Sequence, residues 1–217
     1  MHDYMKLIVV AVIMGYIPVA VVIALLTRSL AVARWQASHD ELTGLMRRQV
    51  ASRYVAERRR GGRATTVVIF DLDQFKSVND KHGHRAGDQL LAAVGSRLEA
   101  QARQLDGCAA RIGGDEFLLV LPAVEPAEHA SQIDGVLRSL SAPVPADGFD
   151  GAVTIYPSAT AGLASAAHSE WTWLLSAADF ALHKSKVASR RVRGASGERL
   201  LPTRPAPVRR APCDVGT

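Results

Sequence analysis

The sequence predicts an α+β fold: a βαββαβ, ferredoxin-like sheet with flanking helices, preceded by one transmembrane helix. Two observations lead to this prediction: a charge-free apolar run near the N-terminus, and an ordered series of strand-like and helix-like segments after it. A chain of 217 residues is long enough for one domain with appendages. We divide it into residues 1–36, a transmembrane helix with a short connector; residues 37–193, the folded domain; and residues 194–217, a disordered tail rich in proline and arginine.

The N-terminal run at 7–26 contains no charged residue, and a helix needs about 20 residues to span a bilayer. Pro18 lies inside the run and is tolerated in membrane helices. Ala31 to Ala33 imitate a signal-peptide cleavage site, but the apolar run exceeds the roughly 7–15 residues of a signal sequence. Because Arg28 and Arg34 follow the span, we expect a single-pass protein of the inner membrane whose folded domain is cytoplasmic.

Charge and cysteine content narrow the compartment and the partners. The formal net charge is +5, and arginine-rich segments suit phosphate-bearing ligands or an anionic membrane face. Cys108 and Cys213 are too few for a disulfide framework and fit a reducing compartment. From Gly194 onward prolines and arginines recur without apolar periodicity, which favours a solvated tail over one that contacts anionic lipid.

The elements of the folded domain follow from apolar periodicity and turn residues. Residues 65–72 are β-branched and apolar, as in a buried strand. A helix is expected at 87–105, followed by a hairpin centred on Gly113 and Gly114. A second helix at 127–140 and a last strand at 153–164 complete the βαββαβ order. Flanking helices are expected at 47–60 and 171–189, and a loop marked by prolines and glycines at 143–151.

The hairpin tip poses a chemical question, because a turn needs its glycines but not two adjacent carboxylates, Asp115 and Glu116. Asp71 and Asp73 share one side of the first strand, since side chains alternate along a strand. In a βαββαβ sheet this strand lies beside the hairpin, which brings Asp71 towards Asp115. Such converging oxygens suit Mg²⁺, which in turn holds phosphate. The alternative is an ordinary turn, with Asp73 capping the segment that follows.

Further polar residues suit a nucleotide but have plainer explanations. Lys76 is able to reach a phosphate as a point charge. Asp88 lies with Asn79 and His84 near the start of the long helix, and its carboxylate matches the paired N–H donors of guanine. Asp88 equally suits the positive end of the helix dipole. The basic residues near the end of the last predicted helix, which include Lys186 and Arg190, suit either a triphosphate or the negative end of a helix dipole.

Together these residues make the sequence resemble the GGDEF family of diguanylate cyclases. The signature stands intact at Gly113 to Phe117, preceded by Arg111. The opening motif appears as "DELTGLMRR" from Asp40, and the strand-end motif as "FDLDQFKSVND" from Phe70. The stretch "GHRAGDQLL" at 83–91 matches without a gap, and "ADFALHKSKVASRR" at 178–191 resembles the closing helix. The resemblance covers residues 37–193 and implies a fold of the nucleotidyl-cyclase type.

The resemblance implies a reaction and a set of site residues. Each domain binds one GTP, and two domains in a homodimer form cyclic di-GMP and two pyrophosphates. Asp71, the Leu72 carbonyl and Asp115 would hold Mg²⁺, for which Mn²⁺ is an alternative. Asp115 is favoured for removing the 3′-hydroxyl proton, with Glu116 as a second ligand or assisting base. The residues carried over as substrate contacts are Lys76, Asn79, His84, Asp88, Gly113, Gly114, Lys186 and Arg190.

Some features depart from the family pattern. Arg47 stands where asparagine is usual, and in the closing helix His183, Ser189 and Arg191 replace the usual tyrosine, glycine and asparagine. An inhibitory Arg-x-x-Asp site is matched by Arg103 and Asp106, but one residue too far upstream, which on a helix rotates a side chain by about 100°.

Two readings from other classes stay open. One is a catalytically silent receptor that binds GTP or cyclic di-GMP, although receptors of this family usually lose a carboxylate of the signature. The other is an inactive scaffold that dimerises through its membrane helix. We expect no nucleic-acid partner.

Overall fold

The computed structural model describes residues 2–167 and 169–196, and side chains at 4–5, 14–167 and 169–188. Contacts divide the chain into two units, Met1–His39 and Asp40–Thr217. The predicted tail at 194–217 therefore lies outside the described residues from 197 onward.

The first unit is one helix, α1 (His2–Ser38), which includes Pro18 and the whole predicted span at 7–26. Its described part Met14–Ser38 contains an 18-residue window with a mean hydropathy of 2.0, and by length and composition it could cross a membrane. The connector expected after the span is helical as well, because α1 continues to Ser38.

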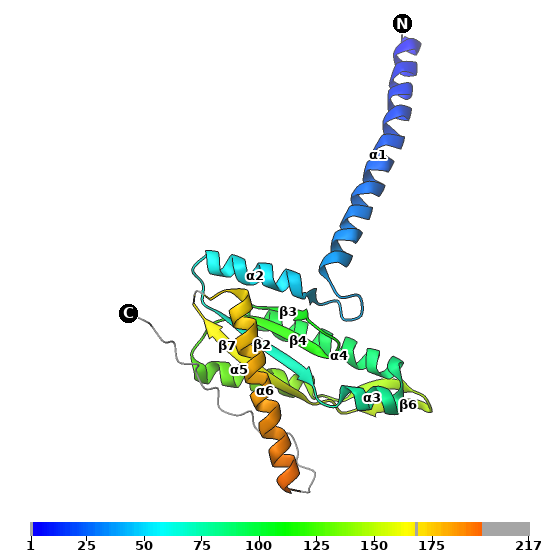
Figure 1. Ribbon diagram of the computed structural model, residues 1–217. Coiled ribbons are helices and arrows are strands. Elements are labelled where there is room, and N and C mark those ends of the chain that lie inside the picture. The colour runs from blue at the N-terminus through cyan, green and yellow to red at the C-terminus, as the bar shows by residue number, and fades with distance from the viewer. Residues whose placement is uncertain (1, 168, 197–217) are drawn as a thin grey trace. The chain divides into compact units, whose positions relative to one another are not determined.

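The second unit is built on a five-stranded sheet with the strand order β1-β3-β4-β2-β7 (Figure 1). The central strand is β2 (Thr65–Leu72), which pairs antiparallel with β4 (Glu116–Pro122) and β7 (Ala159–Ala166). β3 (Cys108–Arg111) forms the predicted hairpin with β4, and the short β1 (Met46–Arg47) pairs parallel with β3. The predicted βαββαβ plan, with the first strand beside the hairpin, is confirmed.

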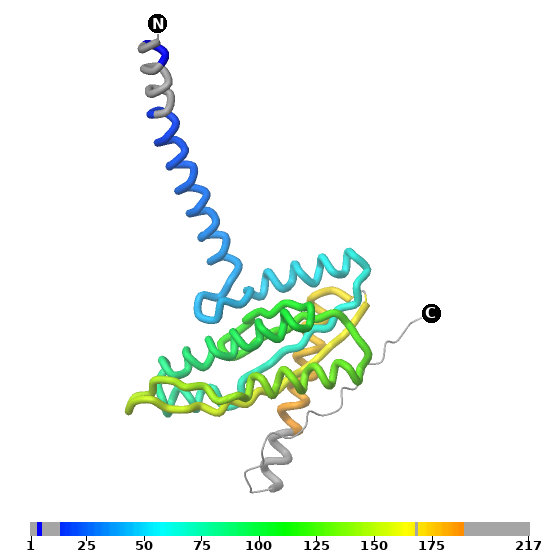
Figure 2. The backbone as a smooth tube through the Cα atoms, turned by 180° about the vertical axis from the view of Figure 1, so that it is seen from behind, coloured from blue at the N-terminus to red at the C-terminus, as the bar shows by residue number. Residues whose placement is uncertain are grey.

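Helices cover both faces of this sheet. Val68 and Phe70 of β2 pack with α4 (His84–Gln104) and α5 (Pro126–Leu140), which lie in front of the sheet in Figure 2. Val67 and Ile69 point the other way and pack with α2 (Arg48–Arg60) and α6 (Trp171–Ser196). The alternation of side chains along β2 thus produces two separate apolar cores. Asp71, the next odd-numbered residue, consequently belongs to the α6 face.

One helix of this region was not predicted: α3 (Phe75–His82) follows the end of β2. The predicted helix α4 begins at His84 rather than at residue 87. Gly83 separates the two helices with φ of 92°, a conformation that glycine adopts readily.

The expected loop at 143–151 is wrong, because it contains most of a hairpin formed by β5 (Val144–Gly148) and β6 (Gly151–Ile155). The last predicted strand, 153–164, is in fact the end of β6 and most of β7. Pro157 lies between them and has no N–H for a ladder.

Candidate functional site

The signature hairpin meets the end of β2, as its antiparallel pairing with β4 requires. Asp71 lies opposite Glu116 in this register. One residue further, the Leu72 N–H donates to the Asp115 carbonyl over 3.2 Å. The structure therefore brings the predicted residues Asp71, Leu72, Asp115 and Glu116 together at one end of the sheet.

Lys186 of α6 reaches this group and forms an ion pair with Asp71, with 2.6 Å between Nζ and Oδ2. The Asp71 side chain is only 14% exposed. Burial raises the pKa of Asp71, and the neighbouring Asp115 and Asp73 charges raise it further, while Lys186 acts in the opposite direction. The surroundings of Asp71 therefore disfavour its ionised form overall, although the ion pair with Lys186 opposes this effect.

Glu116 experiences the same crowding. Its pKa is raised first by burial and then by the charges of Asp71, Asp115 and Asp179, with Lys186 opposing them. Its carboxylate lies close to the backbone of Gly113, where a Cβ would sit 2.8 Å from Oε2. Glycine at this position therefore leaves the Glu116 side chain room at the tip.

The donor set fits a hard divalent cation. Among the described residues no three His, Cys, Asp or Glu side chains form a ready-made metal cluster. Asp71, Asp115 and the Leu72 carbonyl supply two carboxylates and one main-chain oxygen. Mg²⁺ binds through one or two carboxylates and takes its other ligands from water and substrate phosphates. Burial first, and the neighbouring carboxylates after it, raise the pKa of Asp71, and such a cation would stabilise the ionised form.

Asp73 has a different role from Asp71. Its carboxylate accepts hydrogen bonds from Ser158 Oγ at 2.9 Å and from Thr160 Oγ1 at 2.8 Å. Its N–H donates to the Ser158 carbonyl over 2.8 Å. Asp73 therefore ties the end of β2 to β7, and the N-cap residue of α3 is Gln74, whose side chain makes no capping hydrogen bond. Sequence reasoning missed Ser158 and Thr160, which carry no recognisable spacing.

Arg111 binds the backbone of the hairpin tip. Its guanidinium donates to the Gly113 carbonyl (Nε, 3.2 Å) and to the Gly114 carbonyl (Nη2, 2.6 Å). Nη1 also donates to Asp40 Oδ1 over 3.0 Å. Burial raises the pKa of Asp40, but hydrogen bonds from Thr43 and Arg111 outweigh it and leave the pKa lowered. This clamp joins the opening motif to the signature, and sequence reasoning assigned no role to either residue.

The predicted base-reading residues lie where α3 meets α4. Asn79 Oδ1 is buried and has no hydrogen-bond partner. A Cβ on Gly87 would collide with this oxygen, so the glycine makes room for it. Asp88 and His84 are exposed in the first turns of α4, and Lys76 is exposed on α3. An unsatisfied buried acceptor is costly, so Asn79 is suited to receive an N–H from a ligand.

Other predicted residues are separated from the carboxylates. Arg103 lies in the last turn of α4, 3.5 Å from Glu99 and 71% exposed, and Asp106 follows with φ of 52°. Both precede β3 and so lie at its far end from Gly113. The side chains of Arg190, Ser189 and Arg191 lie outside the described side chains.

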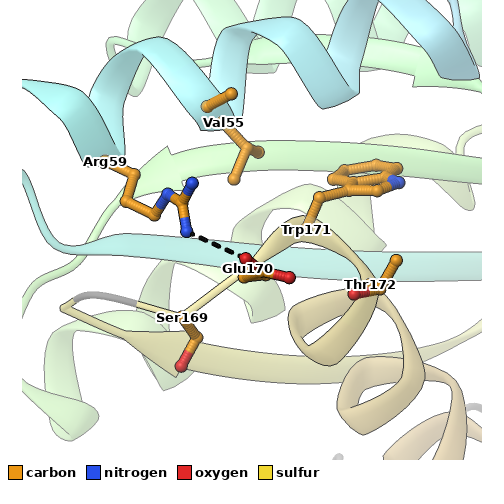
Figure 3. Close-up of a pocket in the computed structure, with 7 residues that line it drawn as sticks. Val55, Arg59, Ser169, Glu170, Trp171 and Thr172 are labelled. Carbon is orange, nitrogen blue, oxygen red and sulfur yellow. Dashed lines mark hydrogen bonds and ion pairs between the residues drawn. The ribbon is translucent and has the colours of Figure 1, made fainter.

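A hollow of about 250 Å³ lies between α2 and the start of α6, lined by Val55, Arg59 and Trp171 among others (Figure 3). Arg59 and Glu170 form an ion pair of 3.4 Å beside it. It borders the start of α6, which follows the end of β7 that pairs with Thr65. The carboxylates lie at the opposite end of β2, so this hollow is separate from the candidate site.

Comparison with known proteins places this geometry in a family. Residues 37–191 match the family model described as diguanylate cyclase, GGDEF domain. Diguanylate cyclase TpbB of Pseudomonas aeruginosa is 35% identical over 166 residues, which is 73% of this chain and 37% of that relative. The names of the curated relatives differ, and one is a cyclic di-GMP phosphodiesterase.

Solved structures share the fold. A sensory box/GGDEF family protein from Caulobacter crescentus gives a TM-score of 0.60 at 34% identity, over 70% of this chain and 99% of that one. The coiled coil and GGDEF domain of DgcB from the same organism, solved with c-di-GMP, gives 0.69 at 26% identity, over 78% of this chain and 91% of that one. The chain spans 20%, 16% and 37% of the first curated relatives. On its family match, the chain belongs to the GGDEF family of diguanylate cyclase domains.

Proposed function

We propose that the protein is a membrane-anchored diguanylate cyclase, which condenses two GTP into cyclic di-GMP and two pyrophosphates. The observation that carries this proposal is the convergence of Asp71, Asp115 and Glu116 at the end of β2, with Lys186 paired to Asp71. The family match and the relatives named diguanylate cyclase support it.

Asp71, the Leu72 carbonyl and Asp115 would hold Mg²⁺, or Mn²⁺ in its place. When bound, the ion supplies neutralisation of phosphate charge and alignment of the reacting oxygens. Asp115 accepts the proton of the 3′-hydroxyl. Glu116 assists, because its raised pKa makes it a stronger base than an ordinary carboxylate.

The remaining residues hold the nucleotide. Asn79 and Asp88 bind the guanine edge, with His84 beside them. Gly113 and Gly114 let phosphate approach the backbone, since neither carries a Cβ. Lys76, Lys186 and Arg190 contact phosphates as cations.

The product contains two nucleotides, while each domain holds one. The 3′-hydroxyl of one GTP must therefore attack the α-phosphate of a GTP held by a second domain. A homodimer follows, and dimer formation becomes an obligatory step.

Residues 1–36 would anchor the chain in the inner membrane, with residues 37–193 as the cytoplasmic cyclase domain and 194–217 as a tail. The charge-free run at 7–26 and the arginines that follow it within α1 support this arrangement.

The direct test incubates the purified full-length protein, in detergent or nanodiscs, with GTP and Mg²⁺ and measures cyclic di-GMP. We expect product from the native chain and none from Asp115→Ala or after chelation with EDTA. Tight GTP binding without product, in a chain forced to dimerise, would contradict the cyclase and favour a receptor.

A further inference from the structure

Phe149 lies at the tip of the β5–β6 hairpin and is 75% exposed. Its ring is nevertheless held against the backbone of Gly83. A Cβ on Gly83 would lie 2.9, 3.0 and 3.3 Å from three carbons of the ring. Phe149 therefore packs closely on Gly83 while most of its surface stays available to a ligand.

The hairpin that carries Phe149 is fastened to the start of α4. Asp147 of β5 accepts hydrogen bonds from Arg85 Nη2 at 2.9 Å and from Gln89 Nε2 at 3.0 Å. Its own N–H donates to Gln89 Oε1 over 2.7 Å. The hairpin tip lies beside α3 in both views of the molecule (Figures 1 and 2). Three hydrogen bonds of Asp147 thus hold the hairpin that carries Phe149 against the first turns of α4.

That place adjoins the residues assigned to the base. The Gly83 N–H donates to the Asn79 carbonyl over 2.8 Å, and the Gly87 N–H donates to the Gly83 carbonyl over 3.2 Å. The unsatisfied Asn79 Oδ1 lies against Gly87, and Asp88 is the next residue. Gly83, under the Phe149 ring, is therefore linked through the backbone to the residues on both sides of the base site.

We propose that Phe149 stacks on the purine of the bound nucleotide and that the β5–β6 hairpin forms the outer wall of the base site. Every base offers a π face to an aromatic ring, so stacking adds affinity without reading the base edge. Asn79 and Asp88 supply edge recognition, and Phe149 positions the ring between them and solvent. This inference rests on the proposed function, in which the ligand is GTP.

The test compares Phe149→Ala with Phe180→Ala in the full-length protein in nanodiscs. Phe180 is a matched control, because it is also an exposed phenylalanine (60%) but lies on α6. We expect Phe149→Ala to raise the KM for GTP by roughly tenfold, as loss of one stacking contact does, with little change in kcat. Phe149→Trp should retain the native KM, whereas Phe149→Leu, which keeps an apolar contact with Gly83, should not.

A second nucleotide separates stacking from edge recognition. ITP lacks the 2-amino group but keeps the purine face, so Phe149→Ala should raise the KM for ITP and for GTP by the same factor. Asp88→Asn should change the ratio of the two. A KM effect confined to GTP, or a Phe149→Leu variant that binds as the native protein does, overturns the stacking role.

Equilibrium binding keeps the two proposals distinguishable. Calorimetry with an α,β-methylene analogue of GTP needs no turnover, and it should show weaker binding to Phe149→Ala than to Phe180→Ala. If cyclic di-GMP forms but the two variants bind the analogue equally, only the inference about Phe149 fails. If no product forms and the analogue does not bind the native protein, both proposals fail.

Discussion

In the candidate site, the charges of single residues balance one another. Asp71 and Glu116 both have raised pKa values, because burial and neighbouring carboxylates disfavour their ionised forms. Lys186 is the cation that opposes this effect at both positions. In the domain without a nucleotide, Lys186 therefore partly neutralises the carboxylates of Asp71 and Glu116.

Replacing Lys186 by methionine should shift the acid side of the activity profile. Without the cation the pKa of Asp71 rises further, so the ionised carboxylates needed for metal binding appear only at higher pH. We expect the acid limb of kcat/KM to move up on the order of one pH unit, with lower activity at neutral pH. Profiles of cyclic di-GMP formation against pH measure this shift. Lys184→Met is the control, since that ammonium lies over the Phe180 ring, 4.4 Å from its centroid; an unchanged limb in Lys186→Met would contradict the role.

At the scale of elements, α6 reaches the carboxylates because it crosses the sheet very closely. Gly162 of β7 lies under the helix, and a Cβ there would collide with the backbone at Ala178 and Leu182. Lys186 follows Leu182 by one helical turn. The missing side chain at Gly162 is thus what sets the height of Lys186 above the sheet.

Gly162→Ala should therefore destabilise the domain and weaken catalysis together. Relieving the collision requires moving helix against strand, and overpacking of this kind costs about 1–3 kcal/mol. Gly135→Ala in α5 is the matched control, because its nearest atom would be Arg138 Nη2 at 3.8 Å, and alanine favours a helix. The measurement is the denaturant midpoint of unfolding, which we expect to be lower for Gly162→Ala than for Gly135→Ala. Equal midpoints would mean that α6 adjusts freely.

Elements with strong periodicity were predictable, and those set by tertiary contacts were not. The repeating apolar residues of α4 and the β-branched run of β2 identify both elements from the sequence. β5 and β6 were not predicted, because the prolines and glycines in that stretch favour a loop. In the structure, hydrogen bonds between Asp147 and α4 hold a hairpin there. The helix α3 was not predicted, because it buries no residue fully and its sequence therefore has little apolar periodicity.

Within the site, the approach of Asp71 to Asp115 followed from topology, whereas particular pairings did not. Arg111 and Asp40 are 71 residues apart in the sequence, and this spacing does not predict their contact. Lys186 was expected to meet phosphate, and its bond to Asp71 emerged only from the packing of α6 on β2.

At the scale of the whole domain, one buried histidine joins three elements. His129 of α5 is 3% exposed, and its Nε2 lies 2.8 Å from Thr66 Oγ1 of β2. The Val124 N–H donates to the same nitrogen over 3.3 Å, and Thr66 Oγ1 lies 2.6 Å from Ser165 Oγ of β7. Because Nε2 accepts a backbone N–H, the ring is neutral, and burial lowers its pKa from the ordinary 6.5.

Stability should consequently fall on acidification. The unfolded chain binds a proton at its ordinary pKa, while the folded chain resists it, so the stabilisation is present above about pH 6.5 and is lost as pH falls through the lowered pKa. Thermal midpoints of the native protein should drop over this window. His129→Gln, which keeps a neutral acceptor, should drop less, and His183→Gln, at an exposed position, should follow the native curve. Parallel curves for all three proteins would refute the assignment.

The Arg111 clamp has a mechanical consequence for the position of the hairpin tip. The same guanidinium grips the carbonyls of the hairpin tip and the carboxylate of Asp40, the first residue of the second unit. A twist of the chain entering at Asp40 must either carry the tip with it or break the ion pair. In the homodimer proposed above, a rotation at Asp40 would therefore change how one signature hairpin faces the other, even where the sheet itself does not move.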